Sequence, residues 1–258
     1  MRRSVHWACA VMLLQGCAGL PGMQAKKPPT AVKQEDFSLA PYLKEVALQS
    51  SVNHDYAAAA SFWGAVFESD PSNREAALKF ASNLRYAGQP QGAISALNKA
   101  LVTHPGDPQL LAERGKAYAG ASDFAPALAD IDEALKTSTK DWTLYSARGV
   151  TLDRLARPAD AEAAYKQALA LSPGNPKVLN NMALNIALSG RLDEAIALLR
   201  TAALHPQATV QVRQNLSLLL AMKGNVDEAG RLARADLSAA MSENNIAFFR
   251  SLKAAAAP

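Results

Sequence analysis

Small side chains recur along this chain at an interval of 34 residues, and this period constrains the fold more than any other feature. One column of the repeat holds alanine every time: Ala59, Ala93, Ala127, Ala161, Ala195 and Ala229. A second column, twelve residues earlier, also holds only small side chains: Ala47, Ala81, Gly115, Gly149, Ala183 and Ser217. A period between about 20 and 50 residues is typical of proteins in which similar units stack on their neighbours. The sequence therefore predicts six stacked copies of one unit.

Residues that start and end helices fall at fixed places in each unit. Side chains that cap helix N-termini share one column: Asn73, Asp107, Asp141, Asn175 and Thr209. Prolines stand where the first turn of a helix is expected: Pro90, Pro108, Pro158 and Pro176. Glycines suited to a left-handed helix end share a third column: Gly88, Gly190 and Gly224. Each unit is thus predicted to be a helix, a tight turn and a second helix.

The composition indicates how these helices pack. Hydrophobic residues make up 49% of the chain but aromatic residues only 6%, so the core must form by close approach of helices. One column of larger side chains is expected to fill the space between successive pairs: Trp63, Leu97, Ile131, Tyr165 and Leu199. The net charge is only +4, and no Lys/Arg cluster with interleaved aromatics occurs, so nucleic-acid binding has little support.

The fourth unit carries a family resemblance. Its spacing resembles the tetratricopeptide repeat at five positions: Gly149, Ala161, Tyr165, Ala168 and Pro173. The resemblance implies an all-α fold, a right-handed α-solenoid of six tetratricopeptide-type helix pairs over residues 39–243. The sixth copy is degenerate, because Ala233 and Asp236 replace a large and a small residue.

The segment 244–258 is expected to close the last repeat as a capping helix followed by a tail. Ile246, Phe249 and Leu252 stand at helical spacing within it. We expect Phe248 and Phe249 to seal the core rather than to bind a partner.

The N-terminus combines two arginines, a short apolar stretch and a cysteine. Arg2 and Arg3 precede an apolar stretch too short to span a bilayer, so residues 1–16 are predicted to be a secretory signal peptide. The ending Leu14–Cys17 resembles the lipobox, in which the cysteine is acylated and becomes the first mature residue. The resemblance implies lipidation of Cys17. The alternative is an ordinary signal peptide with a chance cysteine.

The residues after this cysteine favour a particular location. Ala18 is not aspartate, which by the bacterial sorting rule favours the outer membrane, with the chain on its periplasmic face. Residues 17–38 are rich in proline and lysine and lack apolar periodicity. We therefore expect them to form a lipidated flexible tether.

Residues that could carry chemistry are sparse. The histidines of the repeats fall near turns, and we expect them to be exposed there: His54, His104 and His205. The notable acidic cluster is expected on the solvated face of a second helix: Asp130, Asp132 and Glu133. No metal-binding motif, Gly-rich phosphate loop or nucleophile elbow occurs. The sequence predicts no enzyme, no metal site and no cofactor.

Two segments suggest a narrower resemblance. Leu188–Ala195 and Val212–Leu216 are similar to the TadD family, lipoproteins of tight-adherence (Flp-type) pilus assembly. The resemblance implies a non-enzymatic, outer-membrane-anchored scaffold, pilotin-like, that helps a secretin localise or assemble by binding a partner segment. The alternative is a scaffold for another envelope machine, such as outer-membrane protein insertion or peptidoglycan synthesis. No residue constellation favours an enzyme or an enzyme's regulatory half.

The tetratricopeptide resemblance also implies a binding surface. In that family the first helix of each pair lines a concave groove, which here would contain Lys44, Arg85, Lys116, Asp153, Lys177, Asn180, Asn181, Gln214 and Asn215. Amides can donate to and accept from a peptide backbone, so the last four side chains in this set suit a peptide ligand. They could equally bridge neighbouring helices. Ala112 and Ser146 occupy the first lysine position of the clamp that binds chaperone tails, so we do not expect such tails to bind.

Overall fold

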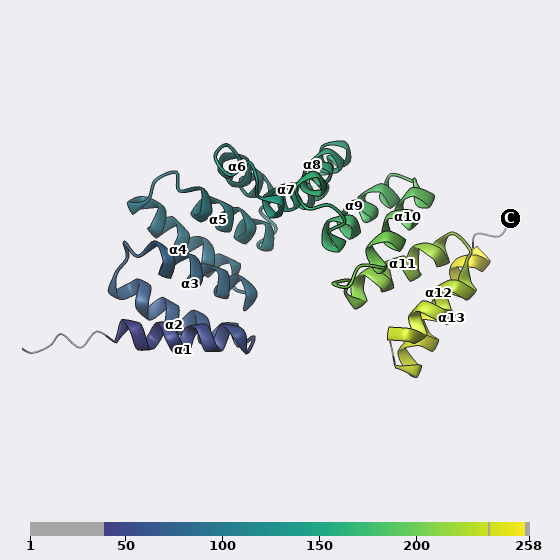
Figure 1. Cartoon of the computed structure of the whole chain (residues 1–258), viewed down its shortest axis with the longest axis horizontal. Coiled ribbons are helices and arrows are strands. Elements are labelled where there is room, and N and C mark those ends of the chain that lie inside the picture. The colour runs from purple at the N-terminus through teal and green to yellow at the C-terminus, as the bar shows by residue number, and fades with distance from the viewer. Residues whose placement is uncertain (1–38, 237, 256–258) are drawn as a thin grey trace, which may run out of the picture. The chain divides into compact units, whose positions relative to one another are not determined.

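The computed structural model describes residues 39–236 and 238–255, and this part of the chain consists of thirteen helices joined by short turns (Figure 1). The predicted signal peptide, the lipidated Cys17 and the tether lie outside the described residues. Each helix packs on the one before it and the one after it. First helices of neighbouring pairs also touch, as α3 touches α5 and α9 touches α11.

The helices alternate between the two members of each pair. The first members are α1 (Ala40–Val52), α3 (Arg74–Tyr86), α5 (Pro108–Gly120), α7 (Trp142–Arg154), α9 (Pro176–Leu188) and α11 (Val210–Met222). The second members are α2 (Tyr56–Ser69), α4 (Pro90–Thr103), α6 (Phe124–Leu135), α8 (Pro158–Leu171), α10 (Leu192–Ala203) and α12 (Val226–Asp236). A thirteenth helix, α13 (Ala239–Ala255), packs on α12 and α11. The predicted all-α solenoid of six helix pairs with a capping helix is confirmed.

Four of the five predicted N-caps are confirmed. Side chains of Asn73, Asp107, Asp141 and Asn175 accept bonds from backbone amides in the first turns of α3, α5, α7 and α9. Thr209 was predicted to cap α11, but its side chain makes no cap bond. Its backbone carbonyl accepts the Val212 amide instead, at 3.1 Å.

The turn inside each pair contains a residue with a positive φ angle in all six repeats. The predicted glycines adopt positive φ angles: Gly88 at 75°, Gly190 at 82° and Gly224 at 90°. The same column in the other repeats holds residues that also adopt positive φ: His54 at 61°, Ser122 at 64° and Ala156 at 55°. Because a left-handed residue ends the first helix in every copy, the turn geometry is kept even where glycine is absent.

The core follows the predicted columns. The alanines of the invariant column are fully buried, and each large residue predicted between successive pairs is at most 1% exposed. Backbones approach closely where the column is glycine. A Cβ atom placed on Gly115 would lie 2.8 Å from Cγ1 of Ile131, which is closer than packed atoms tolerate.

The C-terminal end differs from the prediction in two respects. The capping helix begins at Ala239, inside the range predicted for the sixth repeat, and Ile246 is buried. Phe248 is 53% exposed, so the prediction that it seals the core was wrong. In a single helix only one face meets the last repeat, and Ile246 lies on that face. The side chains of Phe249 and Leu252 lie outside the described part of the chain.

Candidate binding groove

A first hollow of about 490 Å³ lies along the first helices of the second and third repeats. Its wall comes from α3 and α5 and reaches the start of α7. It is lined by Arg74, Glu75, Leu78, Lys79, Ser82, Gln109, Ala112, Glu113, Lys116 and Asp141. Most of these side chains carry charge or hydrogen-bonding groups, so this hollow is polar.

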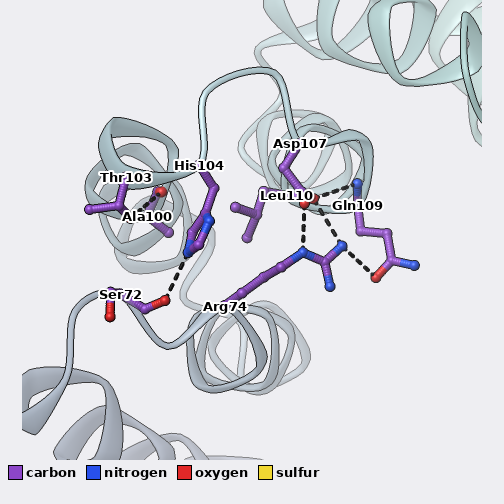
Figure 2. Close-up of polar contacts among 8 residues, drawn as sticks. All are labelled: Ser72, Arg74, Ala100, Thr103, His104, Asp107, Gln109 and Leu110. Atoms are coloured by element: carbon purple, nitrogen blue, oxygen red, sulfur yellow. Dashed lines mark hydrogen bonds and ion pairs between the residues drawn. The ribbon is translucent and has the colours of Figure 1, made fainter.

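Arg74 is fixed to the wall of this first hollow (Figure 2). Its Nε donates to Asp107 Oδ2 at 2.6 Å, and its Nη2 donates to Asp107 Oδ1 at 3.1 Å and to Gln109 Oε1 at 2.9 Å. Burial would raise the pKa of Asp107, but the bonds from Arg74 and from the Leu110 amide lower it below its ordinary value. Asp107 therefore caps α5 and neutralises an arginine of the preceding repeat, which ties the two repeats together.

A second arginine of α3 is neutralised in the same way. Arg85 Nε donates to Glu113 Oε1 at 2.8 Å, and its guanidinium carbon lies 4.3 Å from the ring centroid of Tyr86. Burial opposes the charge on Arg85, but the attraction of Glu113 outweighs it and raises the pKa of the guanidinium. Lys116 Nζ lies 3.8 Å from the other oxygen of Glu113. Arg85, which was predicted to line the groove, thus joins α3 to α5 and does not line the first hollow.

Two lysines of the region differ in their partners. Lys44, which was predicted to line the groove, donates to Glu75 Oε2 at 3.2 Å and so joins α1 to α3. Lys79 is exposed in the first hollow and was not among the predicted residues. Among residues 39–236 and 238–255 its ammonium has no ion-pair partner. Its place four residues after Glu75 on the polar side of α3 was the signal that could have identified it.

A second hollow of about 280 Å³ lies further along the same series of first helices, between α7 and α9. It is lined by Val150, Asp153, Arg154, Tyr165, Asn181, Leu184, Asn185 and Leu188. Leu188 is 88% exposed, and Val150 is also exposed. This hollow is more apolar than the first.

The predicted groove residue Asp153 lies at this second hollow and is already engaged. Its Oδ2 accepts the Tyr165 hydroxyl at 2.7 Å, and its Oδ1 accepts Asn185 Nδ2 at 2.5 Å. Burial, and then the neighbouring Asp153 carboxylate, raise the pKa of the Tyr165 hydroxyl well above its usual value. Asp153 therefore links α7 to α8 and α9.

The predicted amides meet between α9 and α11. Asn215 Nδ2 donates to Asn180 Oδ1 at 2.7 Å, and Asn180 Nδ2 donates to Asn181 Oδ1 at 3.3 Å. Asn180 is only 7% exposed. The sequence left open whether these amides bridge helices or bind a peptide. The bonds show that Asn180 and Asn215 bridge α9 and α11, while peptide binding by the amides stays a prediction. Gln214 is half-buried on α11.

The histidines lie at turns, as predicted, but only His54 is exposed. His104 Nε2 bonds the Ser72 carbonyl at 2.8 Å (Figure 2), and His205 Nδ1 accepts the Gln207 amide at 3.1 Å. Both therefore hold turns together. In the described ranges no group of three or more His, Cys, Asp or Glu is placed to hold a metal ion.

The acidic cluster of α6 is less solvated than predicted. Asp130 is 8% exposed, and both its oxygens accept from Arg114, at 2.7 and 2.8 Å. Asp132 accepts from Arg148 at 2.6 Å. Only Glu133 fits the expectation of an exposed acid. The arginines that reach these carboxylates come from other helices, 16 residues away along the chain. The sequence therefore did not reveal the ion pairs, and the carboxylates were predicted to face water.

Comparison with known families identifies the repeat. Models of the tetratricopeptide repeat match residues 78–142, 112–176 and 155–214, together just over half of the chain. The chain belongs to the tetratricopeptide-repeat family. Tetratricopeptide-repeat folds are protein-interaction scaffolds that bind protein partners and typically carry no catalytic site.

Several solved tetratricopeptide-repeat structures share this fold. PilW, a "widely conserved type IV pilus biogenesis factor", is 20% identical with a TM-score of 0.67, over 77% of this chain and 92% of its own. PilF of Pseudomonas aeruginosa is 17% identical with a TM-score of 0.62, over 76% and 89%. TTC0263, a thermophilic protein of Thermus thermophilus, is 22% identical with a TM-score of 0.61, over 70% and 98%. At these identities the likeness shows the fold alone.

No curated protein sequence matches the chain. Within the described residues, no helix combines the length and the apolar character needed to cross a membrane.

Proposed function

We propose that this tetratricopeptide-repeat protein is a non-enzymatic scaffold that assembles pilus or secretion machinery. It is lipidated at Cys17, is anchored to the periplasmic face of the outer membrane and binds a segment of a partner protein along its first helices. The partner is a secretin or another pilus-assembly component, so the role is pilotin-like.

One observation carries this proposal: two hollows lie along consecutive first helices, one polar and one more apolar. A surface with separate polar and apolar hollows can bind different side chains of one segment selectively. The fold shared with PilW and PilF supports the pilus context, because the first is described as a pilus biogenesis factor. The TadD resemblance supports the same context.

Photocrosslinking in cells tests the binding surface. A photoreactive residue is placed at Lys116 in the first hollow or at Leu188 in the second, with Gln167, exposed on the second helix α8, as the control. We expect one partner to be captured from both hollows and not from Gln167. Capture that does not distinguish these positions would contradict a groove on the first helices.

The identity of the captured protein tests the assignment to a machine. A secretin or pilus component supports the pilotin-like role, whereas a protein of outer-membrane insertion or peptidoglycan synthesis overturns it.

Cys17→Ser tests the anchor. We expect the variant to leave the membrane fraction and the partner to be mislocalised; an unchanged distribution of both proteins would contradict the anchoring role.

A further inference from the structure

The outer face of α1, at one end of the row of helices (Figure 1), carries exposed apolar side chains. Tyr42, Glu45, Gln49 and Val52 follow one another at intervals of three or four residues, so they lie on one face of the helix. All four are exposed, and the two large apolar side chains are 65% exposed at Tyr42 and 71% exposed at Val52. No helix precedes α1 in the described residues. The terminal face of a solenoid is usually polar, so these apolar side chains are unusual for such a position.

The other five repeats show what covers the equivalent face. The residues in the column of Tyr42 are at most 3% exposed there: Ala76, Leu110, Leu144, Val178 and Val212. Those in the column of Gln49 are at most 4% exposed: Asn83, Ala117, Thr151, Asn185 and Leu219. In each of these repeats the first helix packs against the second helix of the repeat before it. The exposed face of α1 is therefore the surface that receives a helix in every other repeat.

Amides in the column of Gln49 bond to the preceding repeat. Asn83 Oδ1 accepts the Ser51 hydroxyl at 3.0 Å, and Asn185 Nδ2 donates to the Pro158 carbonyl at 3.1 Å. In the described residues, the amide of Gln49 bonds instead within its own helix. A side-chain amide can both donate and accept, so Gln49 is suited to a polar contact with a helix that covers α1.

The charges of α1 and α2 indicate the chemistry of a helix that would cover this face. Glu45 stands between Tyr42 and Gln49 and has no ion pair in the part of the chain that the structure describes. Lys44 is the sole lysine or arginine of the two helices, and it already pairs with Glu75 at 3.2 Å. A lysine or arginine of a partner would therefore complement Glu45, whereas a second copy of α1 would bring another carboxylate.

We propose that the outer face of α1 is a second interaction surface, which binds an amphipathic helix of a partner protein. The bound helix takes the position that the second helix of a preceding repeat would occupy. Its apolar side chains cover Tyr42 and Val52, and a lysine or arginine lies beside Glu45. This surface is separate from the hollows of the first helices, so the inference goes beyond the proposed function: one solenoid holds two protein segments at once.

A helix-stapled peptide tests this surface, and the chain itself supplies the template. Helix α10 packs on the first helix α11 as the proposed partner would pack on α1. Two peptides carry the sequence Leu192–Ala203, one with lysine and one with glutamate at the positions that are exposed in α10. The staple is needed because isolated helices of this length are marginal in water. In fluorescence anisotropy with the full chain, we expect the lysine peptide to bind about tenfold more tightly than the glutamate peptide.

Matched variants locate the bound peptide. Tyr42→Ser should weaken binding of the lysine peptide about tenfold, whereas Val102→Ser, which removes a similarly exposed apolar side chain from α4, should leave its affinity unchanged. Glu45→Lys should reverse the preference in favour of the glutamate peptide. Glu68→Lys, the same charge change at an exposed position of α2, should not reverse it. All four residues are exposed, so these substitutions leave the core intact.

A photoreactive residue at Gln49 identifies what covers the face of α1 in the full chain. Crosslinks to the lysine peptide support the inference. Crosslinks between two copies of the chain, or to residues 18–38 of the same chain, would overturn it, as would equal binding of both peptides or no effect of Tyr42→Ser. Photocrosslinking from Lys116 or Leu188 tests the hollows separately, so the proposed function stands or fails independently of this result.

Discussion

A Cβ atom added to Gly149 of α7 would lie 2.4 Å from Cε1 of Tyr165 on α8. The ring cannot move aside easily, because it is 1% exposed and its hydroxyl is held by Asp153 at 2.7 Å. Helices α7 and α8 therefore approach as closely as they do because one of them has no side chain at this point.

Gly149→Ala is expected to lower the free energy of unfolding by about 1–3 kcal/mol, because overpacking outweighs the higher helix propensity of alanine. Gly120→Ala is the matched control, since its added Cβ would lie 3.5 Å from the Pro90 Cβ, an ordinary contact. That variant should be unchanged or up to about 1 kcal/mol more stable. Urea denaturation of both variants checks this; equal effects would contradict the packing argument.

A double-mutant cycle tests the bridge between Asn180 and Asn215. Because the 2.7 Å bond joins α9 to α11, replacing each residue by alanine, singly and together, should reveal a coupling of about 0.5–1.5 kcal/mol. Gln214→Ala, on the same helix, should change stability by less than about 0.5 kcal/mol. Zero coupling in urea denaturation would remove the bridging role and leave ligand binding as the reason for these amides.

The fold could be predicted from the sequence because its determinants are local. Caps such as Asp107 and turn residues such as Gly190 act within a few positions of themselves, and the small columns fix where backbones meet. The prediction that Thr209 caps α11 was wrong, because the position of a residue in the repeat does not decide which group its side chain contacts. Phe248 failed because only one face of a terminal helix meets the core.

The sequence predicted which helices line the candidate site, but not which of its charged side chains are free of partners within the protein. Arg85 and Asp153 do lie at the first helices, yet each is already bonded to a neighbouring helix. Lys79 was missed, although among the cations that line the first hollow it is the one without an ion pair in the described part of the chain. Which charges remain unpaired depends on contacts between repeats, and one sequence does not reveal those contacts.

Asp130 and Glu133 of α6 should respond differently to loss of charge. Asp130→Asn removes one partner of a buried two-bond ion pair with Arg114, so we expect a loss of about 1–3 kcal/mol of stability. Glu133 pairs with Lys136 on the surface, so Glu133→Gln should cost less than about 0.5 kcal/mol. Urea midpoints measure both. Equal small losses would restore the view of a solvated acidic face.

The ion pair between Arg213 and Asp236 should make the last repeat sensitive to acid. Two bonds, at 2.6 and 2.7 Å, lower the pKa of Asp236 below its ordinary value of 3.8, although burial opposes the shift. A lowered folded-state pKa means that the stabilisation is complete above 3.8 and is lost as the pH falls through the folded-state value.

Asp236→Asn should therefore lower stability by about 1–3 kcal/mol near neutral pH, and its difference from the natural chain should shrink below about pH 4. Urea denaturation between about pH 2 and pH 7 measures this difference. Asp227→Asn is the control, because it removes an equal charge from the exposed side of α12, where that carboxylate has no ion pair within the described residues. A difference for Asp236→Asn that stays constant down to the lowest pH would mean that the shape of the side chain, rather than its charge, holds α11 to the end of α12.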